Sequence, residues 1–334
     1  MSIADSNWRL SLAADAGHCR LCGTTTEQRH FWNEVYANSG QQLRRCGHCA
    51  GVYLAPGFDE QGIAHFYQER YRYLFPAEVP WKDLTRFFAW RGDRVFAQQR
   101  LALINSALPE NARLFELGSG FGAFLGAVAS KRPDVHLLAN EPDRVHRQML
   151  LGGAPVDFIE ELSELAPASL EAVVSFHVVE HLPNPLDSLD RLAQVLAPGG
   201  QLWLEVPDIR ADWRTRLYVH PAHLSYFCAE SLGNLVTAAG FEVLACGPHP
   251  LTSLQGNLWL HARRTESSTR SRPLAAAPDV IVEIDRWIER VDWRPSDRIR
   301  ALLKRASIAL LGPGLIGEWR RWRQWRQRRQ EDHS

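Results

Sequence analysis

The chain has 334 residues, 45% of them hydrophobic and 23% charged, and its 38 basic and 38 acidic side chains cancel. Such a chain buries a large core and has room for more than one domain, which excludes disorder along its whole length. Zero net charge gives no reason to expect nucleic acid as a partner. The first residues contain no apolar run, and the late apolar stretch 308–317 is shorter than the about 20 residues of a spanning helix. We therefore expect a cytoplasmic protein without a secretion signal.

Four of the six cysteines form two Cys-x-x-Cys pairs in a short, loop-rich stretch: Cys19, Cys22, Cys46 and Cys49. Two such pairs can place four thiolates tetrahedrally around Zn²⁺, and a small unit gains much of its folding energy from the metal. We predict a structural zinc ribbon over 15–55. Because four protein ligands leave no open position, this zinc is not expected to be catalytic.

Alternatives to four thiolates exist. A redox pair would open a helix after a strand, and neither pair does. His18 or His48 could replace one cysteine as a ligand. The other two thiols, Cys228 and Cys246, lie in apolar surroundings typical of buried core residues.

The predicted domain organisation has five parts. They are a zinc-ribbon unit (15–55), an aromatic-rich helical connector (56–108), an α/β domain (109–264), a linker (265–285) and a basic helical tail (286–334). In the α/β part, short β-rich runs alternate with helical patterns, which is typical of a parallel sheet covered by helices.

Seven strands are expected in the α/β domain: 113–117, 135–140, 156–159, 172–176, 201–206, 241–245 and 257–262. The clearest helix follows the fourth strand. Asn184 can cap it, Pro185 suits its first turn, and the pair Gly199 and Gly200 should stop it.

A glycine-rich loop follows the first of these strands, in the order Glu116-Leu-Gly118-Ser-Gly120-Phe-Gly122. Glycines permit a tight turn and a close approach of backbone to a ligand. Glu141, at the end of the second strand, could accept hydrogen bonds from ribose hydroxyls. A dinucleotide site fits this pattern too, as does a turn that only packs a helix.

Two further segments distinguish these interpretations: Ala172 to Pro185, which contains His177-Val-Val-Glu180-His181, and Leu196 to Asp208. Together with the glycine loop, in this order and spacing, they resemble the class I S-adenosylmethionine-dependent methyltransferases. The group nearest in appearance includes the ubiquinone-pathway O-methyltransferases, and the resemblance covers roughly 87–264. It implies a Rossmann-like α/β fold, a seven-stranded sheet with helices on both faces. A zinc ribbon before such a domain also resembles bacterial methyltransferases of sugar or surface-polysaccharide pathways.

The resemblance implies a role for each matching position. Glu116 and the loop would hold the methionine end of S-adenosylmethionine, and Glu141 would hold its ribose. Glu160, or Glu161 beside it, would lie near the adenine amine. The full cofactor-binding set is Glu116, Gly118, Gly120, Gly122, Glu141, Pro142, Glu160, Phe176 and His177.

Methyl transfer requires mainly that the acceptor be positioned in line with the methyl group, and a hydroxyl acceptor also needs a base. In relatives, the long region after the fifth strand surrounds the acceptor. Its His223 is our candidate base, with His177 and His220 as alternatives, because imidazole has an ordinary pKa near about 6.5. Arg210, Arg214 and Arg216 suit an anionic acceptor, and arginines on a solvated surface are the alternative interpretation.

We therefore expect O-methylation of a small molecule, such as a sugar, a nucleotide-sugar or a surface-polysaccharide precursor. Two rival hypotheses remain. One is a non-catalytic scaffold that binds partners through the ribbon and tail, and the other is a nucleotide-dependent oxidoreductase.

The tail from Glu318 to Gln330 packs six arginines around Trp319, Trp322 and Trp325. As a helix this pattern suits peripheral contact with anionic lipid at the inner face of a membrane. A helix docked on the protein itself, and RNA binding, are the alternatives.

Overall fold

The structure is a computed structural model. It describes residues 12–13, 17–32, 40–58, 62–63, 66, 93–143, 146–147, 153–211, 219, 221–266 and 270–290. The predicted Trp/Arg-rich tail therefore lies outside the described residues, except for the short part of it that ends at Arg290. None of the described helices is long and apolar enough to cross a membrane.

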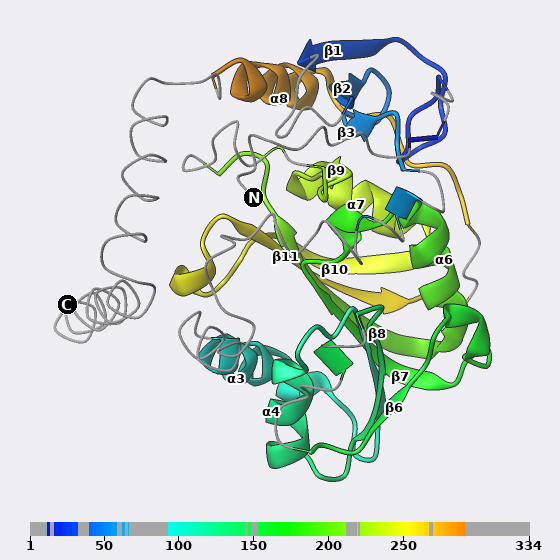
Figure 1. Cartoon of the computed structure of the whole chain (residues 1–334), viewed down its shortest axis with the longest axis vertical. Helices are drawn as coiled ribbons and strands as arrows, with labels where there is room; N and C mark the ends of the chain where they lie inside the picture. Colours follow the sequence, from blue (N-terminus) through cyan, green and yellow to red (C-terminus); the bar gives the residue numbers. More distant parts are fainter. Residues whose placement is uncertain are drawn as a thin grey trace, which may run out of the picture.

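A seven-stranded sheet forms the centre of the molecule (Figure 1). Its strands are β4 (Arg113–Leu117), β5 (His136–Asn140), β6 (Val156–Phe158), β7 (Leu170–Phe176), β8 (Leu196–Pro207), β10 (Phe241–Pro248) and β11 (Asn257–Arg264). The order is β10-β11-β8-β7-β4-β5-β6, parallel except for β11, which runs antiparallel to both β8 and β10. All seven predicted strands are confirmed.

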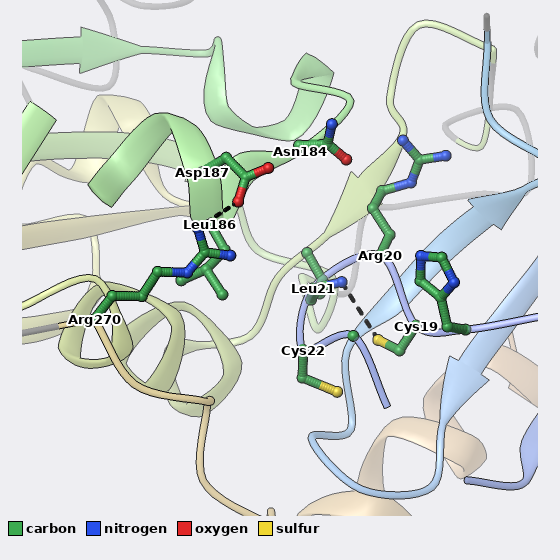
Figure 2. Close-up of a pocket in the computed structure, with 10 residues that line it drawn as sticks. Cys19, Arg20, Leu21, Cys22, Asn184, Leu186, Asp187 and Arg270 are labelled. Carbon is green, nitrogen blue, oxygen red and sulfur yellow. Dashed lines mark hydrogen bonds and ion pairs between the residues drawn. The ribbon is translucent and has the colours of Figure 1, made fainter. Parts of the chain in front are cut away.

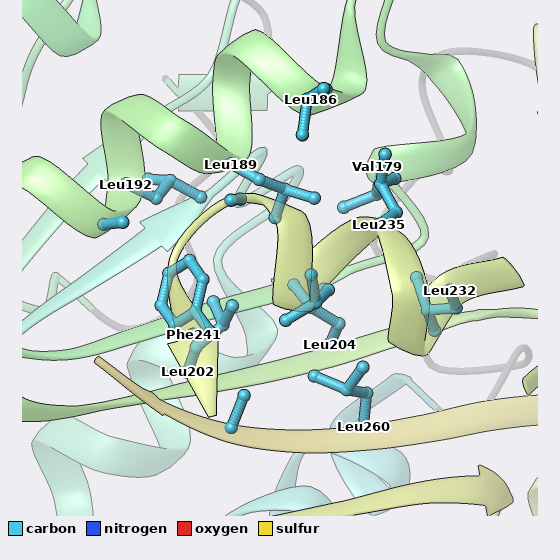
Figure 3. Packing of buried hydrophobic residues seen from close by; sticks show 14 of the residues in the cluster. Val179, Leu186, Leu189, Leu192, Leu202, Leu204, Leu232, Leu235, Phe241 and Leu260 are labelled. Carbon is cyan, nitrogen blue, oxygen red and sulfur yellow. The ribbon is translucent and has the colours of Figure 1, made fainter. Parts of the chain in front are cut away.

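Helices cover both faces because side chains alternate along each strand. Leu114, Val174 and Trp203 pack with α3 (Asp93–Ile104) and α4 (Ala123–Lys131). The alternate positions Val173, Leu202 and Leu204 pack with α6 (Pro185–Val195) and α7 (Ala229–Ala238). Figure 3 shows Leu202 and Leu204 near the buried leucines of these two helices. One face of α6 is apolar, and its residues Leu186, Leu189, Leu192 and Ala193 are all buried.

The ends of α6 differ from the prediction. Asn184 precedes the helix, but its side chain makes no capping hydrogen bond. The helix ends at Val195, and the Gly199–Gly200 pair lies inside β8, where the register against β7 shifts. A Cβ on Gly200 would approach the Ala197 carbonyl oxygen to 2.8 Å, so this bulge needs glycine.

The N-terminal unit is a second, antiparallel sheet in the order β1-β2-β3-β9. Its strands are β1 (Gln28–Trp32), β2 (Gln42–Cys46), β3 (Val52–Ala55) and β9 (Ser225–Tyr226). The first three belong to the ribbon, whereas β9 comes from the α/β domain. The two units are therefore joined by strand pairing.

Two predicted boundaries need correction. Residues 278–285, expected as linker, form the first part of α8 (Pro278–Arg290), which packs Ile284 and Ile288 against the ribbon sheet (Figure 1). The helix α3, expected in the connector, packs on α4 and so belongs to the α/β core. The described residues also include four 3₁₀ turns: η4 (Asn105–Ala107), η5 (Leu162–Glu164), η6 (Val179–His181) and η8 (Thr252–Leu254).

Candidate active site and metal centre

The four ribbon cysteines lie together in the core, with sulfur atoms within 4.8 Å of one another. Sγ of Cys19 is 3.8 Å from Sγ of Cys49, and Sγ of Cys22 is 3.7 Å from that of Cys46. These separations are too long for disulfides. Tetrahedral Zn–S bonds of about 2.3 Å place neighbouring sulfurs about 3.8 Å apart, so the cluster fits Zn²⁺.

Each Cys-x-x-Cys turn aims a backbone N–H at its first sulfur. Leu21 donates to Sγ of Cys19 at 3.4 Å, and His48 donates to Sγ of Cys46 at 3.3 Å. The His48 imidazole does not reach the cluster, because its Nε2 lies 3.2 Å from the Pro273 carbonyl oxygen. The exposed His18 is also outside the cluster. Four thiolates, without a histidine substitute, are the ligand set that the geometry supports.

The glycine loop connects β4 to α4 with positive φ at Gly118 (70°), Gly120 (53°) and Gly122 (68°). Residues with a Cβ rarely adopt this region. Gly118 also has Val178 so close that a Cβ would lie 2.4 Å from it, whereas beside Gly120 there is open space. The loop therefore presents backbone to an open side at Gly120.

Glu141 closes this loop from the neighbouring strand. It is 6% exposed, and its Oε2 accepts a 2.7 Å hydrogen bond from the Gly120 N–H. Its Oε1 accepts from the Asp143 N–H at 2.9 Å and lies 3.4 Å from Nδ1 of His146. The predicted loop residues and their acidic partner are thus brought together.

Glu116 lies beneath the loop with 4% of its surface exposed. Burial raises the pKa of its carboxyl well above the ordinary value, against the lowering effect of Arg100. Among the described residues Oε2 of Glu116 has no hydrogen-bond partner. A buried acceptor of this kind fits a ligand that brings a donor, such as the ammonium group of a methionine moiety.

The predicted adenine-side residues are more exposed. Glu160 forms a two-pronged ion pair with Arg147, at 2.5 and 2.8 Å, and its side chain is 72% exposed. Glu161 instead caps the turn η5. Pro142, beside Glu141, is exposed. Of the two candidates, Glu160 is the one on the same side as Glu141, because Arg147 also donates to the Glu141 carbonyl oxygen.

Phe176 is the last residue of β7, and His177 follows it directly at the same edge of the sheet. The Phe176 ring contacts Phe124 and Trp259, and the Arg100 guanidinium lies 4.7 Å from its centre. His177 has φ of +59°, a conformation that is costly for a residue with a Cβ and that is typical of functional positions.

The His177 imidazole lies between two buried carboxylates. Its Nδ1 is 3.4 Å from Oε1 of Glu180, and its Nε2 is 3.1 Å from Oε1 of Glu205. Burial alone would lower its pKa, but the hydrogen bonds to Glu180 and Glu205 outweigh burial and raise the pKa to about 9. His177 therefore holds its proton at neutral pH.

Glu205 is a member of this site that sequence reasoning missed. It is fully buried near the end of β8 and contacts four polar side chains from other elements: Arg100 at 2.7 Å, Asn257 at 2.7 Å, His177 at 3.1 Å and His249 at 3.5 Å. Burial would raise the pKa of Glu205, but hydrogen bonds to His177 and His249 and the nearby charges of His177 and Arg100 lower it well below the ordinary value. A signal existed, since Glu205 interrupts an otherwise apolar strand sequence.

His223, the candidate base, packs against the turn η6. Its ring centre lies 4.8 Å from that of His181 and 6.0 Å from that of Tyr226. Ligand atoms of Glu180, His181 and His223 all lie within 4.8 Å of one another. The Nδ1–H of His181 donates to the Ala222 carbonyl oxygen, 2.7 Å away, and burial lowers the pKa of His181. Glu180 thus stands between His177 and the His181–His223 pair.

The predicted anion-binding arginines are only partly described. Arg210 forms ion pairs with Glu230 at 3.2 Å, Glu283 at 3.5 Å and Asp208 at 3.7 Å, so acidic groups of the protein surround it. Arg214, Arg216 and His220 lie outside the described residues.

A cavity of about 180 Å³ lies elsewhere, between the first Cys-x-x-Cys turn and the start of α6 (Figure 2). Arg20, Asn184, Asp187 and Arg270 line it, and Arg270 pairs with Asp187 at 2.6 Å. It is separate from the glycine loop, so it is not the cofactor site.

Comparison with known proteins identifies the α/β domain. A family described as methyltransferase domain matches residues 89–245. "Methyltransferase str3" of Strobilurus tenacellus is 30% identical over 138 residues, which cover 41% of this chain and 48% of that protein. The "Ubiquinone biosynthesis O-methyltransferase" of Xylella fastidiosa (strain 9a5c) is 31% identical over 113 residues, which cover 31% of this chain and 46% of that protein. The chain thus spans about half the length of the curated relatives it matches.

Solved structures are similar at lower identity. An S-adenosylmethionine-dependent methyltransferase from Mesorhizobium loti has a TM-score of 0.41 and 17% identity, covering 49% of this chain and 96% of that one. The family match assigns residues 89–245, which contain β4 to β8 and most of β10, to a methyltransferase domain.

Proposed function

We propose that this protein transfers a methyl group from S-adenosylmethionine to a hydroxyl of a small-molecule acceptor of the sugar, nucleotide-sugar or surface-polysaccharide-precursor class. The observation that carries the proposal is the pairing of the open Gly120 turn with the buried carboxylates of Glu116 and Glu141. The relatives named as O-methyltransferases support the hydroxyl, and the preceding ribbon supports the acceptor class by resemblance alone.

In this proposal the cofactor supplies an already activated methyl group, so the protein mainly binds and orients. Glu116 would accept the cofactor's ammonium donors, and Glu141 would accept its ribose hydroxyls. Glu160 and Pro142 would border the adenine, while Phe176 would cover the cofactor from the end of β7. The placement of these side chains at one edge of the sheet supports these assignments, which the resemblance implies.

His223 is our proposed base for the acceptor hydroxyl. His177 fits this role less well, because both of its nitrogens face carboxylates and it holds its proton at neutral pH. His177 fits better as a hydrogen-bond donor that the two carboxylates hold in place beside the cofactor site. The pair of Glu180 and His181 would keep the His223 ring in position.

The four ribbon thiolates would hold one structural Zn²⁺ that takes no part in methyl transfer. We place the protein in the cytoplasm, in peripheral contact with anionic lipid through its tail.

Two measurements test the proposed function. Calorimetry with S-adenosylmethionine and with its demethylated product should show binding of both. Transfer of labelled methyl from S-adenosylmethionine into fractionated cell extract, followed by mass identification, should reveal a hydroxylated product. Binding without transfer into any fraction would favour a non-catalytic scaffold, and fluorescence evidence of NADH binding would favour an oxidoreductase.

A further inference from the structure

The segment 221–228 that carries His223, called here the acceptor-side segment, is hydrogen-bonded to the zinc ribbon. Its strand β9 pairs with β3, with Tyr53 opposite Ser225. The Leu54 N–H also donates to the Leu224 carbonyl oxygen at 3.0 Å. One edge of the segment is therefore fixed by the ribbon.

The other edge of the same segment is bonded to the α/β domain. The Leu224 N–H donates to the Glu180 carbonyl oxygen at 2.8 Å, and the Ala222 carbonyl oxygen lies 2.7 Å from Nδ1 of His181. The acceptor-side segment is thus a single extended stretch that is hydrogen-bonded to the ribbon along one edge and to the turn η6 along the other.

Side chains reinforce the ribbon contact. Phe58, which follows β3, is 7% exposed and stacks on Phe66 with ring centres 4.9 Å apart. Both pack with Ala222 and Leu224 in one buried cluster.

The strand β9 has only two residues, which is too short to hold its own position without a longer partner. Its partner β3 begins at Val52, three residues after Cys49, so the cysteine cluster lies directly next to the start of β3 in the sequence. In contrast, Glu116, Glu141 and the glycine loop are positioned by β4 and β5, which belong to the other sheet.

We propose that the metal-loaded ribbon is the positioning element of the acceptor site. It holds His223 against Glu180 and His181, so that the order of the acceptor side depends on the ribbon's metal whereas cofactor binding does not. That segment 221–228 binds the acceptor rests on the proposed function. That its order depends on the ribbon's metal does not.

The test compares the full-length protein with Zn²⁺ bound, after chelation, and after Zn²⁺ is restored. Hydrogen exchange is measured for peptides covering 221–228 and 113–123, and product affinity is measured by calorimetry with S-adenosylhomocysteine. Metal removal should speed exchange in 221–228 by at least about tenfold, reversibly, because local opening free energies set exchange rates. Exchange in 113–123 and the affinity should change less than about twofold.

Substitutions separate metal loss from segment loosening. Phe58→Ala should keep the metal and still speed exchange in 221–228, with partial recovery in Phe58→Leu. Arg20→Met, which removes hydrogen bonds to the Pro183 and Leu54 carbonyl oxygens, provides a second arm if Phe58→Ala does not fold. The control is Leu274→Ala, since Leu274 is 65% exposed.

Unchanged exchange in 221–228 after metal removal would overturn the inference. Equal loosening of both peptides would also overturn it, because the ribbon would then stabilise the whole fold rather than position one segment. If the zinc-loaded wild type does not bind S-adenosylhomocysteine, that result would count against the proposed function. The hydrogen-exchange comparison of 221–228 with 113–123 would still test the role of the ribbon.

Discussion

Glu141 already uses both carboxylate oxygens within the protein, accepting from the N–H groups of Gly120 and Asp143. A ribose bound at this edge would donate hydrogen bonds to the Glu141 carboxylate, which the backbone N–H groups of the loop already hold in place. This preorganisation reduces the ordering cost that binding would otherwise carry.

Glu141→Ala should weaken S-adenosylmethionine and its demethylated product alike, because both contain the ribose. Removing a charged hydrogen-bond acceptor costs about 1.5–3 kcal/mol, which corresponds to about tenfold or more in affinity. Calorimetry with both ligands measures this. Glu242→Ala, at an exposed ion pair on β10, is the control. Unchanged affinity for both ligands would place the ribose elsewhere.

The protonation of His177 predicts a pH dependence of stability. Its folded pKa of about 9 exceeds the unfolded value of about 6.5, so its contribution is fully present below about 6.5 and is lost as pH rises through about 9. The side chain is 39% exposed, so solvent screens part of the effect.

Thermal unfolding between pH 6 and 10 checks this expectation. The Tm advantage of wild type over His177→Gln should shrink as pH rises through about 9. Parallel Tm curves for wild type and His177→Gln would show that His177 is not charged in the folded state.

His223→Ala should lower turnover by about 10²–10⁴ with nearly unchanged cofactor affinity, if His223 removes the acceptor's proton. The wild-type rate should also rise with pH through the histidine range, and that rise should vanish in the variant. Near-normal turnover with an unchanged pH profile would move the role to His177 or His220, or indicate an acceptor that needs no base.

At the scale of elements, the ribbon is organised by its two Cys-x-x-Cys turns. The purified protein should contain about one Zn²⁺, and Cys46→Ser should lose it and loosen residues 15–55. Metal analysis by mass spectrometry and proteolysis measure the two effects. Cys246→Ser, which lies outside the cluster, should keep the metal. Full occupancy in Cys46→Ser would contradict the four-thiolate site.

The helix α8 is attached to the ribbon through Asp285. This carboxylate accepts from Arg45 at 2.7 and 2.8 Å and from Arg29 at 2.6 Å, and its side chain is 12% exposed. Although burial opposes it, hydrogen bonding to both arginines lowers the pKa of Asp285. The stabilisation is present above the unfolded pKa of about 3.9 and is lost as pH falls below it.

Asp285→Asn should destabilise the protein by about 3 kcal/mol or more, because it leaves the buried Arg45 guanidinium without its counter-charge. Glu289→Gln, at a 55% exposed side chain that also pairs with Arg29, should cost at most about 1 kcal/mol. Denaturant unfolding compares the two. Equal small losses would show that α8 is held by Ile284 and Ile288 alone.

At the scale of the whole molecule, two sheets of different origin share the segment around His223. The cofactor edge is built by β4, β5 and β7 of the large sheet, whereas β9 extends the ribbon sheet into the α/β domain. In our proposals the candidate site therefore has a cofactor half on the large sheet and an acceptor half that the ribbon positions.

The sequence alone determined the features that depend on local pattern. Strand positions follow from alternating apolar runs, the metal cluster from two Cys-x-x-Cys spacings, and the glycine loop from the need for positive φ at Gly118 and Gly120. The end of α6 was predicted wrongly because Gly199 and Gly200 suit a strand bulge as well as a helix stop.

Only the tertiary structure decided which distant residues meet. Glu205 gathers Arg100, His177, His249 and Asn257 from separate elements, and no local spacing encodes that convergence. The pairing of β3 with β9 likewise joins residues more than 170 positions apart. Such contacts depend on the burial of whole faces and on sheet order, which are properties of the folded chain rather than of any short window within it.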